Sequence, residues 1–511
     1  DPGAINHFQA LATALSATVG LGNIGGVALA IALGGPGAVF WMWVVGILGM
    51  AIKMTEVTLS MLYRNTDDPE NPHGGPMWVA EKALARANWP RLGRAIGIIF
   101  CLSMLVSAAT GGNMFQAWNI GEITQTYYGV PSWISGIVIA VIVGVVIIGG
   151  IKRIGRFAAT VVPLMVLLYI VAGTWVLAAN FTSIPAMFAL IVESAFSPAA
   201  AGGAFVGGSV FFAFQIGMKR AIFSNEAGQG SSPMVHAAAK TDEPVREGIV
   251  GGLEPFIDTI VVCTFTALII LSTGIWNRAP DHAFDVVPTF TQTDEGWALP
   301  STPAPGIDWT AGEAAFIVVR GDANEQTANS LHKLAGVAMP VDGGYEIVWN
   351  PIASNVEPQI ASDGFYRNYI GATLTAKAFD SVTPGLGKWV IVIATWLFGL
   401  STMISWSYYG EQGVVFIGGE KLVLGYKLLY CGLIILATLG FVKTDADLDN
   451  VIGVGTGIIV FANIPITLMF AYQAMRAYKD YIARLKAGRI GPGHPAPSIE
   501  DLLTGRDIER Q

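Results

Sequence analysis

The residues Ser16-Ala17-Thr18-Val19-Gly20-Leu21-Gly22-Asn23-Ile24-Gly25-Gly26 decide the fold of this chain. They lie inside an apolar run, about residues 7–33, which is long enough to cross a bilayer at roughly 20 residues per crossing. Four glycines fall within seven residues here, and each glycine in a helix interior costs about 1 kcal/mol relative to alanine. The stretch therefore predicts a membrane-spanning helix that is interrupted near its middle.

An interrupted helix has two interpretations. Its freed backbone N–H and C=O groups are tolerated in a membrane only where protein or a polar ligand satisfies them. Secondary transporters use such freed carbonyls and half-helix ends to hold ions and small zwitterions. The glycines could instead serve only to let two helices pack closely. The spacing leaves both interpretations open, and our working hypothesis is a transporter with its site at the break.

The composition predicts a polytopic membrane protein. Of the 511 residues, 53% are hydrophobic and 13% are charged, whereas soluble domains average about 25% charged residues. The mean hydropathy is +0.54, and apolar runs of about 20 residues recur along the chain. The net charge of −8 arises mostly in polar segments. No basic patch is interleaved with aromatic residues, so we expect a lipid bilayer and not nucleic acid as the partner.

The apolar runs predict ten spans, at about residues 7–33, 38–63, 96–120, 133–151, 158–179, 201–216, 248–271, 389–409, 427–441 and 451–471. The sixth run is also rich in glycine, at Gly202, Gly203, Gly207 and Gly208. Lysine and arginine gather in the short loops after spans two, four and six and after span ten. By the positive-inside rule, both ends of this chain are then expected in the cytoplasm.

We divide the chain into four parts. Residues 1–276 form a transmembrane core with the first repeat and the start of the second, and residues 388–475 complete that core. Residues 277–387 form a polar insert that is far longer than an ordinary loop, expected on the extracytoplasmic side. It contains short runs with strand composition at 316–319 and 345–349, which predict a small β-containing lobe. Residues 476–511 form a cytoplasmic tail.

The two glycine-interrupted spans are the first and the sixth, so they lie five spans apart. Five spans carry the chain across the membrane an odd number of times, so the two halves start on opposite sides. This arrangement is expected for an inverted 5+5 repeat with two discontinuous helices. The fold class we predict is an all-α polytopic membrane protein with this repeat and a β-containing external insert.

Several strings in the sequence resemble the alanine or glycine:cation symporter family, the bacterial sodium:alanine symporters. They are residues 14–24, Gly34-Gly35-Pro36-Gly37-Ala38-Val39-Phe40-Trp41-Met42-Trp43, Gly74-Gly75-Pro76-Met77, residues 112–116, Lys219-Arg220, residues 223–228 and Trp406-Ser407-Tyr408-Tyr409-Gly410-Glu411. Residues 19–23 are also similar to the first-helix break of sodium-driven neurotransmitter-type symporters. The resemblance implies a LeuT-like fold, sodium-coupled uptake of a small neutral amino acid, and a location in the bacterial plasma (inner) membrane.

The sequence departs from the family pattern at four places. Leu21 stands where the family usually has threonine, and Ser405 stands where glycine is usual. The insert is longer than the family's usual connection. The family's additional helix before the broken span is not in this sequence, which leaves open whether the natural chain begins further upstream.

Sodium (Na⁺) is a hard cation that prefers oxygen ligands. The resemblance implies one sodium site from the carbonyls of Ser16, Val19 and Phe398 and the hydroxyls of Ser401 and Thr402. The sequence itself shows only that two adjacent hydroxyls lie in an apolar span, and these could bond back to carbonyls of their own helix. A second sodium site at Thr18 and Asn23 is also considered.

An amino-acid substrate needs a place for each of its three parts. Its carboxylate suits the positive end of a half-helix at residues 20–22, and its ammonium suits carbonyls freed by the break. Its side chain needs a tight apolar wall. The resulting candidates are Ala17, Thr18, Gly20, Leu21, Gly22, Phe115, Gln116 and Trp406, with Gly207 and Gly208 at the second break. Each aromatic residue and each glycine could instead serve only in packing.

Charged residues inside spans are functional candidates by default. Lys53 and Glu56 lie three apart, and this spacing favours a mutual salt bridge or snorkelling over a functional role. Glu254 and Asp258 lie four apart and cannot attract each other. We expect Lys219-Arg220 and Glu226 at the cytoplasmic exit of span six, either as a gate network or as a solvated face.

The first functional hypothesis is a sodium-coupled symporter of alanine or glycine that works by alternating access. The alternative is an amino-acid-binding sensor or receptor on a transporter-like membrane scaffold. No HExxH, GxSxG or paired His/Cys constellation falls in a span, so we do not expect an enzyme. The sequence does not decide the enantiomer, the ion stoichiometry, the oligomeric state or the role of the insert.

Overall fold

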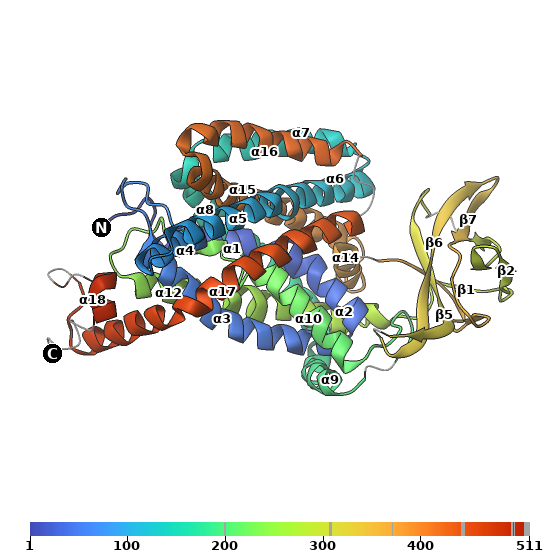
Figure 1. Cartoon of the computed structure of the whole chain (residues 1–511). Coiled ribbons are helices and arrows are strands. Elements are labelled where there is room, and N and C mark those ends of the chain that lie inside the picture. Colours follow the sequence, from blue (N-terminus) through green and yellow to red (C-terminus); the bar gives the residue numbers. More distant parts are fainter. Residues whose placement is uncertain are drawn as a thin grey trace.

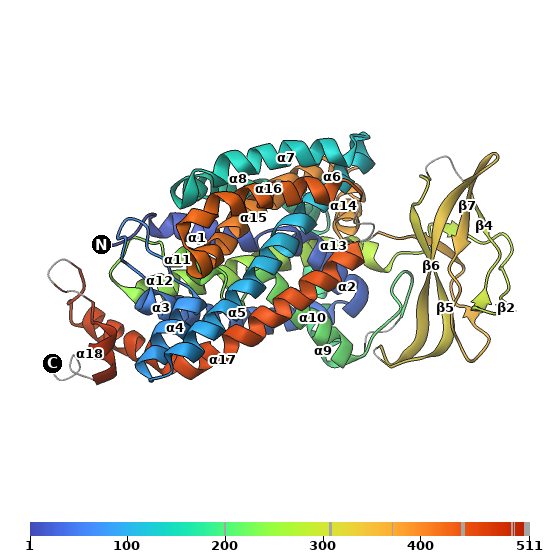
Figure 2. The same ribbon diagram turned by 45° about the horizontal axis from the view of Figure 1, so that its top comes forward.

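The computed structural model describes the chain except for residues 199–200, 306–308, 326, 370, 441–444, 492–493, 495 and 505–511. It consists of a helical body with a β lobe at one end (Figure 1). The N-terminus and α18, Ile499–Thr504, lie at the end opposite the lobe in both views (Figures 1 and 2). The insert and the two expected cytoplasmic segments therefore lie far apart along the helical body.

The first span is interrupted as the sequence predicts. Helix α1, His7–Thr18, starts with a capping box, in which the Asn6 side chain accepts from the Gln9 N–H and the Gln9 side chain accepts from the Asn6 N–H. It ends where the glycines begin. A π-helical turn over Gly22–Gly26 leads into α2, Val27–Gly34, and the two halves are bent by 51°.

The third span is also irregular. Helix α5, Pro90–Ala109, passes through a π-helical turn at Thr110–Met114 into α6, Phe115–Tyr128. A π-helical turn inserts an extra residue and often marks a functional site. The other helices of the first half are α3, Gly37–Tyr63, α4, Pro76–Arg86, α7, Ser132–Ile147, α8, Gly150–Ala179, and α9, Ile184–Phe196.

The second half starts with α10, Val210–Asn225, and α11, Ser232–His236. It continues with α12, Pro244–Gly252, a π-helical segment at Phe256–Cys263, and α13, Thr264–Thr273. After the insert come α14, Ala372–Asp380, α15, Leu386–Gly418, α16, Val423–Thr438, and α17, Asp445–Lys486. Among the described residues, seven helices and the bent α1–α2 pair are long and apolar enough to cross a membrane. The shorter α7 and α10 stand at the other two predicted spans.

The prediction that the second interruption lies at Gly207 and Gly208 is wrong. These glycines precede α10, and Gly207 has a φ of 82°, which fits a turn before the helix. The Ser209 side chain then caps α10 by accepting from the Phe212 N–H at 3.1 Å. Helix α10 ends only at Glu226, whose φ is 57°, and the next helix, α11, begins at Ser232.

The same shift moves the basic pair. Lys219 and Arg220 lie inside α10 and not in a loop after residue 216, so the predicted end of this span is wrong. The sixth span was predicted too early in the sequence. Its glycines precede the N-terminus of α10, whereas the break follows the C-terminus of the same helix.

The insert forms the expected β-containing lobe. Its sheet has the strand order β1-β9-β5-β6-β7-β4, with β8 also paired to β5. The long central strands are β5, Ala314–Asn324, β6, Asn329–Val341, and β7, Gly344–Trp349. The shorter strands are β1, His282–Ala283, β2, Thr291–Thr293, β3, Gly296–Ala298, β4, Thr302–Ala304, β8, Gln359–Ile360, and β9, Gly364–Arg367. The lobe has its own apolar core, which includes Trp309, Ile317 and Phe365.

One lysine makes the stability of this lobe pH-dependent. Burial, together with the charge of Arg278, lowers the pKa of Lys333 to about 8. The folded lobe therefore binds this proton less tightly than the unfolded chain, whose value is 10.5. We expect protection of β5–β6 amides from hydrogen exchange to rise between about pH 8 and 10, after correction for intrinsic exchange rates. Lys333→Met should flatten this dependence, and an unchanged slope would contradict it.

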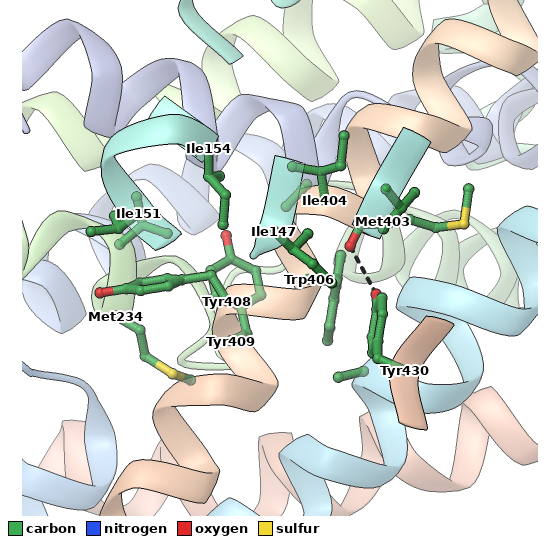
Figure 3. Packing of buried hydrophobic residues seen from close by; sticks show 14 of the residues in the cluster. Ile147, Ile151, Ile154, Met234, Met403, Ile404, Trp406, Tyr408, Tyr409 and Tyr430 are labelled. Carbon is green, nitrogen blue, oxygen red and sulfur yellow. Dashed lines mark hydrogen bonds between the residues drawn. The ribbon is translucent and has the colours of Figure 1, made fainter. Parts of the chain in front are cut away.

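Helix α15 is the central helix of the body. Figure 3 shows the buried cluster around it, which includes Ile147 of α7, Ile151 of α8 and Tyr430 of α16. The Tyr430 hydroxyl donates a hydrogen bond of 2.9 Å to the carbonyl of Met403. Close packing and interhelical hydrogen bonds of this kind hold membrane helices together. They give α15 a fixed position beside the interrupted α1–α2 pair.

Candidate functional site

The end of α1 contacts α15 through a cluster of buried oxygen atoms. The carbonyl of Ser16 accepts from the Thr402 hydroxyl at 3.2 Å and from the Ser401 hydroxyl at 3.4 Å. The Ser16 hydroxyl donates to the carbonyl of Ser401 at 2.7 Å. The Ser401 hydroxyl also donates to the carbonyl of Phe398 at 2.9 Å, and the Ser405 hydroxyl donates to that of Ser16 at 2.9 Å.

The structure thus brings together four of the five residues expected at the first sodium site. The fifth, Val19, is fully buried directly after α1. The polar atoms are neutral carbonyl and hydroxyl oxygens, which suit a hard monovalent cation. Hydroxyls can rotate their hydrogen away and offer lone pairs to an ion. Among the described residues, no group of three or more His, Cys, Asp or Glu side chains could hold a metal ion.

Gly20 allows the two helices to meet. A Cβ atom at this position would lie 2.8 Å from the Thr402 hydroxyl oxygen, which is closer than such atoms approach in proteins. The glycine therefore serves both the break in the first helix and the close approach to α15. The sequence left open whether the glycines form a binding site at the break or allow close helix packing, and Gly20 is placed where it can do both.

A small cavity of about 30 Å³ lies beside this oxygen cluster. A water needs roughly 10–15 Å³ on this measure, so the space suits a few waters or a very small solute. Its lining residues are Ala17, Thr18, Gly20, Leu21, Gly22, Ser107, Gly111, Gln116, Phe223, Glu226, Gln229, Thr402, Trp406 and Thr456. Seven of the ten substrate candidates from the sequence are in this set. Phe115, Gly207 and Gly208 are not.

Two buried polar atoms of the lining residues have no hydrogen-bond partner in the part of the chain that the structure describes. The Gln116 side-chain amide donates to the carbonyl of Gly111 at 3.1 Å, but its Oε1 is buried with no hydrogen-bond partner among the described residues. The Ser107 hydroxyl oxygen is likewise buried with no hydrogen-bond partner among the described residues. A buried acceptor without a partner is costly and calls for an explanation. A ligand that donates hydrogen bonds into the cavity would satisfy both atoms.

Phe115 lies on a second and larger cavity of about 350 Å³. This cavity is bordered by α2, α6, α10 and the start of α14, and it shares Leu21, Gly22 and Phe223 with the small one. The rings of Phe115 and Phe223 meet edge to face with their centroids 6.4 Å apart. Adjacent helical residues point about 100° apart, so Gln116 reaches the small cavity while Phe115 faces the larger one.

The structure does not bring Thr18 and Asn23 together as a second ion site. The Thr18 hydroxyl bonds back to its own helix, at 3.3 Å from the carbonyl of Ala14. The Asn23 Oδ1 accepts from the Gly20 N–H at 2.8 Å, and its amide donates to Asp258 Oδ1 at 2.6 Å. Asp258 is one of the two carboxylates left unpaired by the sequence. The second sodium site stays a prediction, because Thr18 and Asn23 do not share a cluster of oxygen atoms like that of the first site.

Lys53 and Glu56 do not form the expected salt bridge. Lys53 instead pairs with Glu254 of the segment after α12, at 2.9 Å between Nζ and Oε2. Glu56 is hydrogen-bonded by the side-chain amide of Asn463 on α17. The i,i+3 spacing could not predict this, because both partners come from helices that are distant in the sequence.

Six residues that line the small cavity were not among the substrate or sodium candidates: Ser107, Gly111, Phe223, Glu226, Gln229 and Thr456. Phe223 and Glu226 belong to a string that carried the family resemblance, but the break was placed elsewhere. Gln229 lies in the same unwound segment. Ser107 and Thr456 are small polar residues in long apolar runs and gave no signal of their own.

A bent, interrupted first helix, a second interruption after α10, and a small cavity beside buried oxygens are features of membrane transporters, which bind ions and substrates at such unwound segments. The chain belongs to the sodium:alanine symporter family, whose model matches residues 1–296 and 359–493. This is a family of transporters and not of enzymes. The part of the insert at 297–358 lies outside the match.

Similar proteins come from both archaea and bacteria. The sodium/alanine symporter AgcS of Methanococcus maripaludis is 35% identical over 84% of this chain and 74% of its own length. The putative sodium/proton-dependent alanine carrier protein YrbD of Bacillus subtilis is 33% identical over 95% of this chain and 82% of its own.

The crystal structure of MhsT in complex with L-phenylalanine is similar in fold, with a TM-score of 0.54 at 12% identity. The match covers 92% of this chain and 90% of MhsT. The LeuT-like fold is therefore confirmed at the level of overall architecture. The inverted 5+5 repeat within it stays a prediction.

Proposed function

We propose that this protein is a sodium-coupled symporter that takes up alanine or glycine by alternating access. The observation that carries the proposal is the contact of Ser16 with Ser401 and Thr402 beside a small cavity. An ion bound there would touch both α15 and the interrupted helix that also lines the cavity. Binding of ion and amino acid would thus stabilise the same arrangement of two helices, which is what coupling requires.

The substrate's polar groups have matching partners in the cavity. The first N–H groups of the half-helix that starts at Leu21 and Gly22 have no partner within that helix, and they lie at its positive end. They suit the carboxylate. The free Oε1 of Gln116 and the carbonyls of Ala17 and Thr18 suit the ammonium.

The small volume of the cavity favours alanine or glycine over larger amino acids. Trp406 and Leu21 would form the apolar wall for the side chain. The printed names of AgcS and YrbD, which mention alanine, support the same substrate class. We place the protein in the bacterial plasma (inner) membrane with the β lobe on the extracytoplasmic side.

Uptake into proteoliposomes tests this proposal. With an inward sodium gradient we expect labelled alanine or glycine to accumulate above its equilibrium level, and we expect accumulation to stop when sodium is equal on both sides and no other ion gradient is imposed. A screen of the common amino acids by competition would define the substrate range. Sodium-dependent alanine binding without accumulation would contradict transport and favour the sensor alternative.

Leu21 should set the substrate range. Leu21→Thr replaces an apolar wall of the cavity with a shorter, hydroxylated side chain. We expect the ratio of serine to alanine uptake to rise by about 10-fold, since one methylene-sized change in a pocket is worth roughly 1–3 kcal/mol. Competition by unlabelled serine measures it.

Leu29→Thr is the matched control, because Leu29 lines only the larger cavity of the two. An identical substrate profile for Leu21→Thr and the unaltered protein would show that Leu21 does not touch the ligand.

A further inference from the structure

A continuous chain of titratable side chains joins four helical segments away from the sodium site. His7 Nδ1 contacts Glu247 Oε2, and Glu247 Oε1 lies 2.6 Å from His236 Nδ1. His236 Nε2 lies 2.6 Å from Glu254 Oε1, and Glu254 Oε2 accepts from Lys53 Nζ at 2.9 Å. The His7 side chain is 35% exposed, whereas the other four have no exposed surface. The chain therefore leads from the protein surface into its interior.

The interior end of this chain approaches the small cavity. Lys53 Nζ also donates to the Ser232 hydroxyl at 2.8 Å. The hydroxyl of the preceding residue, Ser231, donates to the carboxylate of Glu226. Lys53 and Glu226 interact electrostatically as well. Glu226 lines the cavity. Lys53 and Glu226 are thus each hydrogen-bonded to one of two adjacent serines, Ser232 and Ser231, and the polar groups extend from His7 to the proposed substrate site with one step, between these two hydroxyls, that is not hydrogen-bonded.

The middle of the chain must hold a shared proton. A neutral imidazole has one donor and one acceptor nitrogen, but both nitrogens of His236 face carboxylate oxygens. The second contact needs an additional proton, either on the imidazole or on Glu247 or Glu254. The same heavy-atom positions serve all three placements. A proton can therefore move between these groups without a rearrangement of the helices.

Carboxylates outnumber the buried cations around His236. The helices packed against His236 are α1, α3, α12 and α15. Their titratable groups are His7, Lys53, Glu56, Tyr63, Arg246, Glu247, Lys388, Tyr408, Tyr409 and Glu411, and Arg64, Glu226 and Glu254 lie beyond the ends of these helices. The Arg64 guanidinium donates to the backbone carbonyls of Ala237 and Ala239 and also interacts electrostatically with Glu247. The buried groups of the cluster are the carboxyls of Glu56, Glu226, Glu247 and Glu254 with Lys53 and a protonated His236, whereas Arg64 and His7 lie at its edge. Buried unpaired charge is costly, so the cluster favours further bound protons.

We propose that this chain is a proton relay that carries a proton between Glu226 at the cavity and His7 at the cytoplasmic surface. Lys53 passes a proton to Glu254 and is reprotonated from Glu226 when the hydroxyls of the adjacent Ser231 and Ser232 rotate toward each other; each hydroxyl gains one O–H bond and loses the other. The proton then moves from Glu254 to His236, to Glu247, to His7 and into water. Each step breaks one N–H or O–H bond and forms another, and one positive charge is moved in total. Chains of acidic residues and histidine serve this purpose in other transporters.

The relay rests on the proposed function and adds a second coupling ion to it. The test uses the full-length protein in proteoliposomes with equal sodium on both sides and the membrane potential clamped at zero. A pH difference of one unit, acid outside, should by itself accumulate labelled alanine up to about 10-fold if one proton moves with each alanine. A separate sodium gradient at equal pH measures sodium-driven accumulation in the same vesicles.

His236→Gln keeps hydrogen-bonding groups but removes the exchangeable proton, and Glu247→Gln does the same one step nearer the surface. We expect both variants to lose accumulation driven by the pH difference and to retain accumulation driven by sodium. His73→Gln is the matched control, since His73 contacts Gln412 outside this chain. It should retain both.

Three outcomes would overturn the relay. The unaltered protein could respond to sodium but not to the pH difference, or both variants could respond to the pH difference like the unaltered protein. Both variants could also lose the two responses equally, which would show that the chain is only structural. If the unaltered protein responds to neither gradient, the proposed transport function itself fails, and the relay with it.

Discussion

Thr402→Val is expected to remove most of the sodium stimulation of transport. Valine has nearly the same shape as threonine but lacks the hydroxyl that faces the carbonyl of Ser16 at 3.2 Å. A hydrogen-bonding group that interacts with a charge is worth roughly 1.5–3 kcal/mol, so the apparent affinity for sodium should fall by about 10- to 100-fold. The measurement is alanine uptake as a function of sodium concentration.

Thr395→Val is the matched control. Thr395 is buried on the same helix, and its hydroxyl has no hydrogen-bond partner among the described residues. This variant should keep the sodium dependence of the unaltered protein. If Thr402→Val also keeps it, the assignment of the ion to the contact between α1 and α15 is wrong.

Gly112→Ala is expected to weaken alanine uptake strongly at saturating sodium. A Cβ atom at Gly112 would lie 2.4 Å from Cγ of Trp406, so the indole ring would have to move from its place in the cavity wall. Overpacking of this kind costs about 1–3 kcal/mol, and the apparent affinity for alanine should fall by about 10-fold or more. The apparent affinity for sodium should change less, because Trp406 is not among the ion ligands.

Gly432→Ala on α16 controls for a general effect of the added methyl group, since a Cβ there meets no atom within 4 Å. Equal losses in both glycine variants would argue against a specific role of Trp406. A loss of sodium affinity larger than the loss of alanine affinity in Gly112→Ala would place the tryptophan near the ion instead.

The first interruption could be predicted because its cause is local. Gly20 and Gly22, with the two glycines that follow, disfavour helix wherever they stand in a span. The second could not be located in the same way, because glycine serves turns as well as breaks. Gly207 adopts a positive φ before α10, whereas the actual break begins at Glu226, a residue with no intrinsic preference for that conformation.

The sodium ligands came from the family resemblance and not from spacing. Ser16 and Thr402 are far apart in the sequence, and only the fold shows that their oxygens meet. The partners of Lys53 and Glu56 were missed for the same reason. A rule based on residue spacing considers one helix at a time. Lys53 and Glu56 are instead bound by side chains of other segments, Glu254 and Asn463. The proton chain through His236 was invisible at that level, because its members come from α1, α3, α11 and the α12 region.

A structure of this protein determined with sodium and alanine bound would test the central claim most directly. We predict an ion between the carbonyl of Ser16 and the hydroxyls of Ser401 and Thr402, and an amino acid in the small cavity against Gln116 and Trp406. Alanine bound only in the larger cavity beside Phe115, with the Ser16–Thr402 hydrogen bond intact and no ion there, would contradict it.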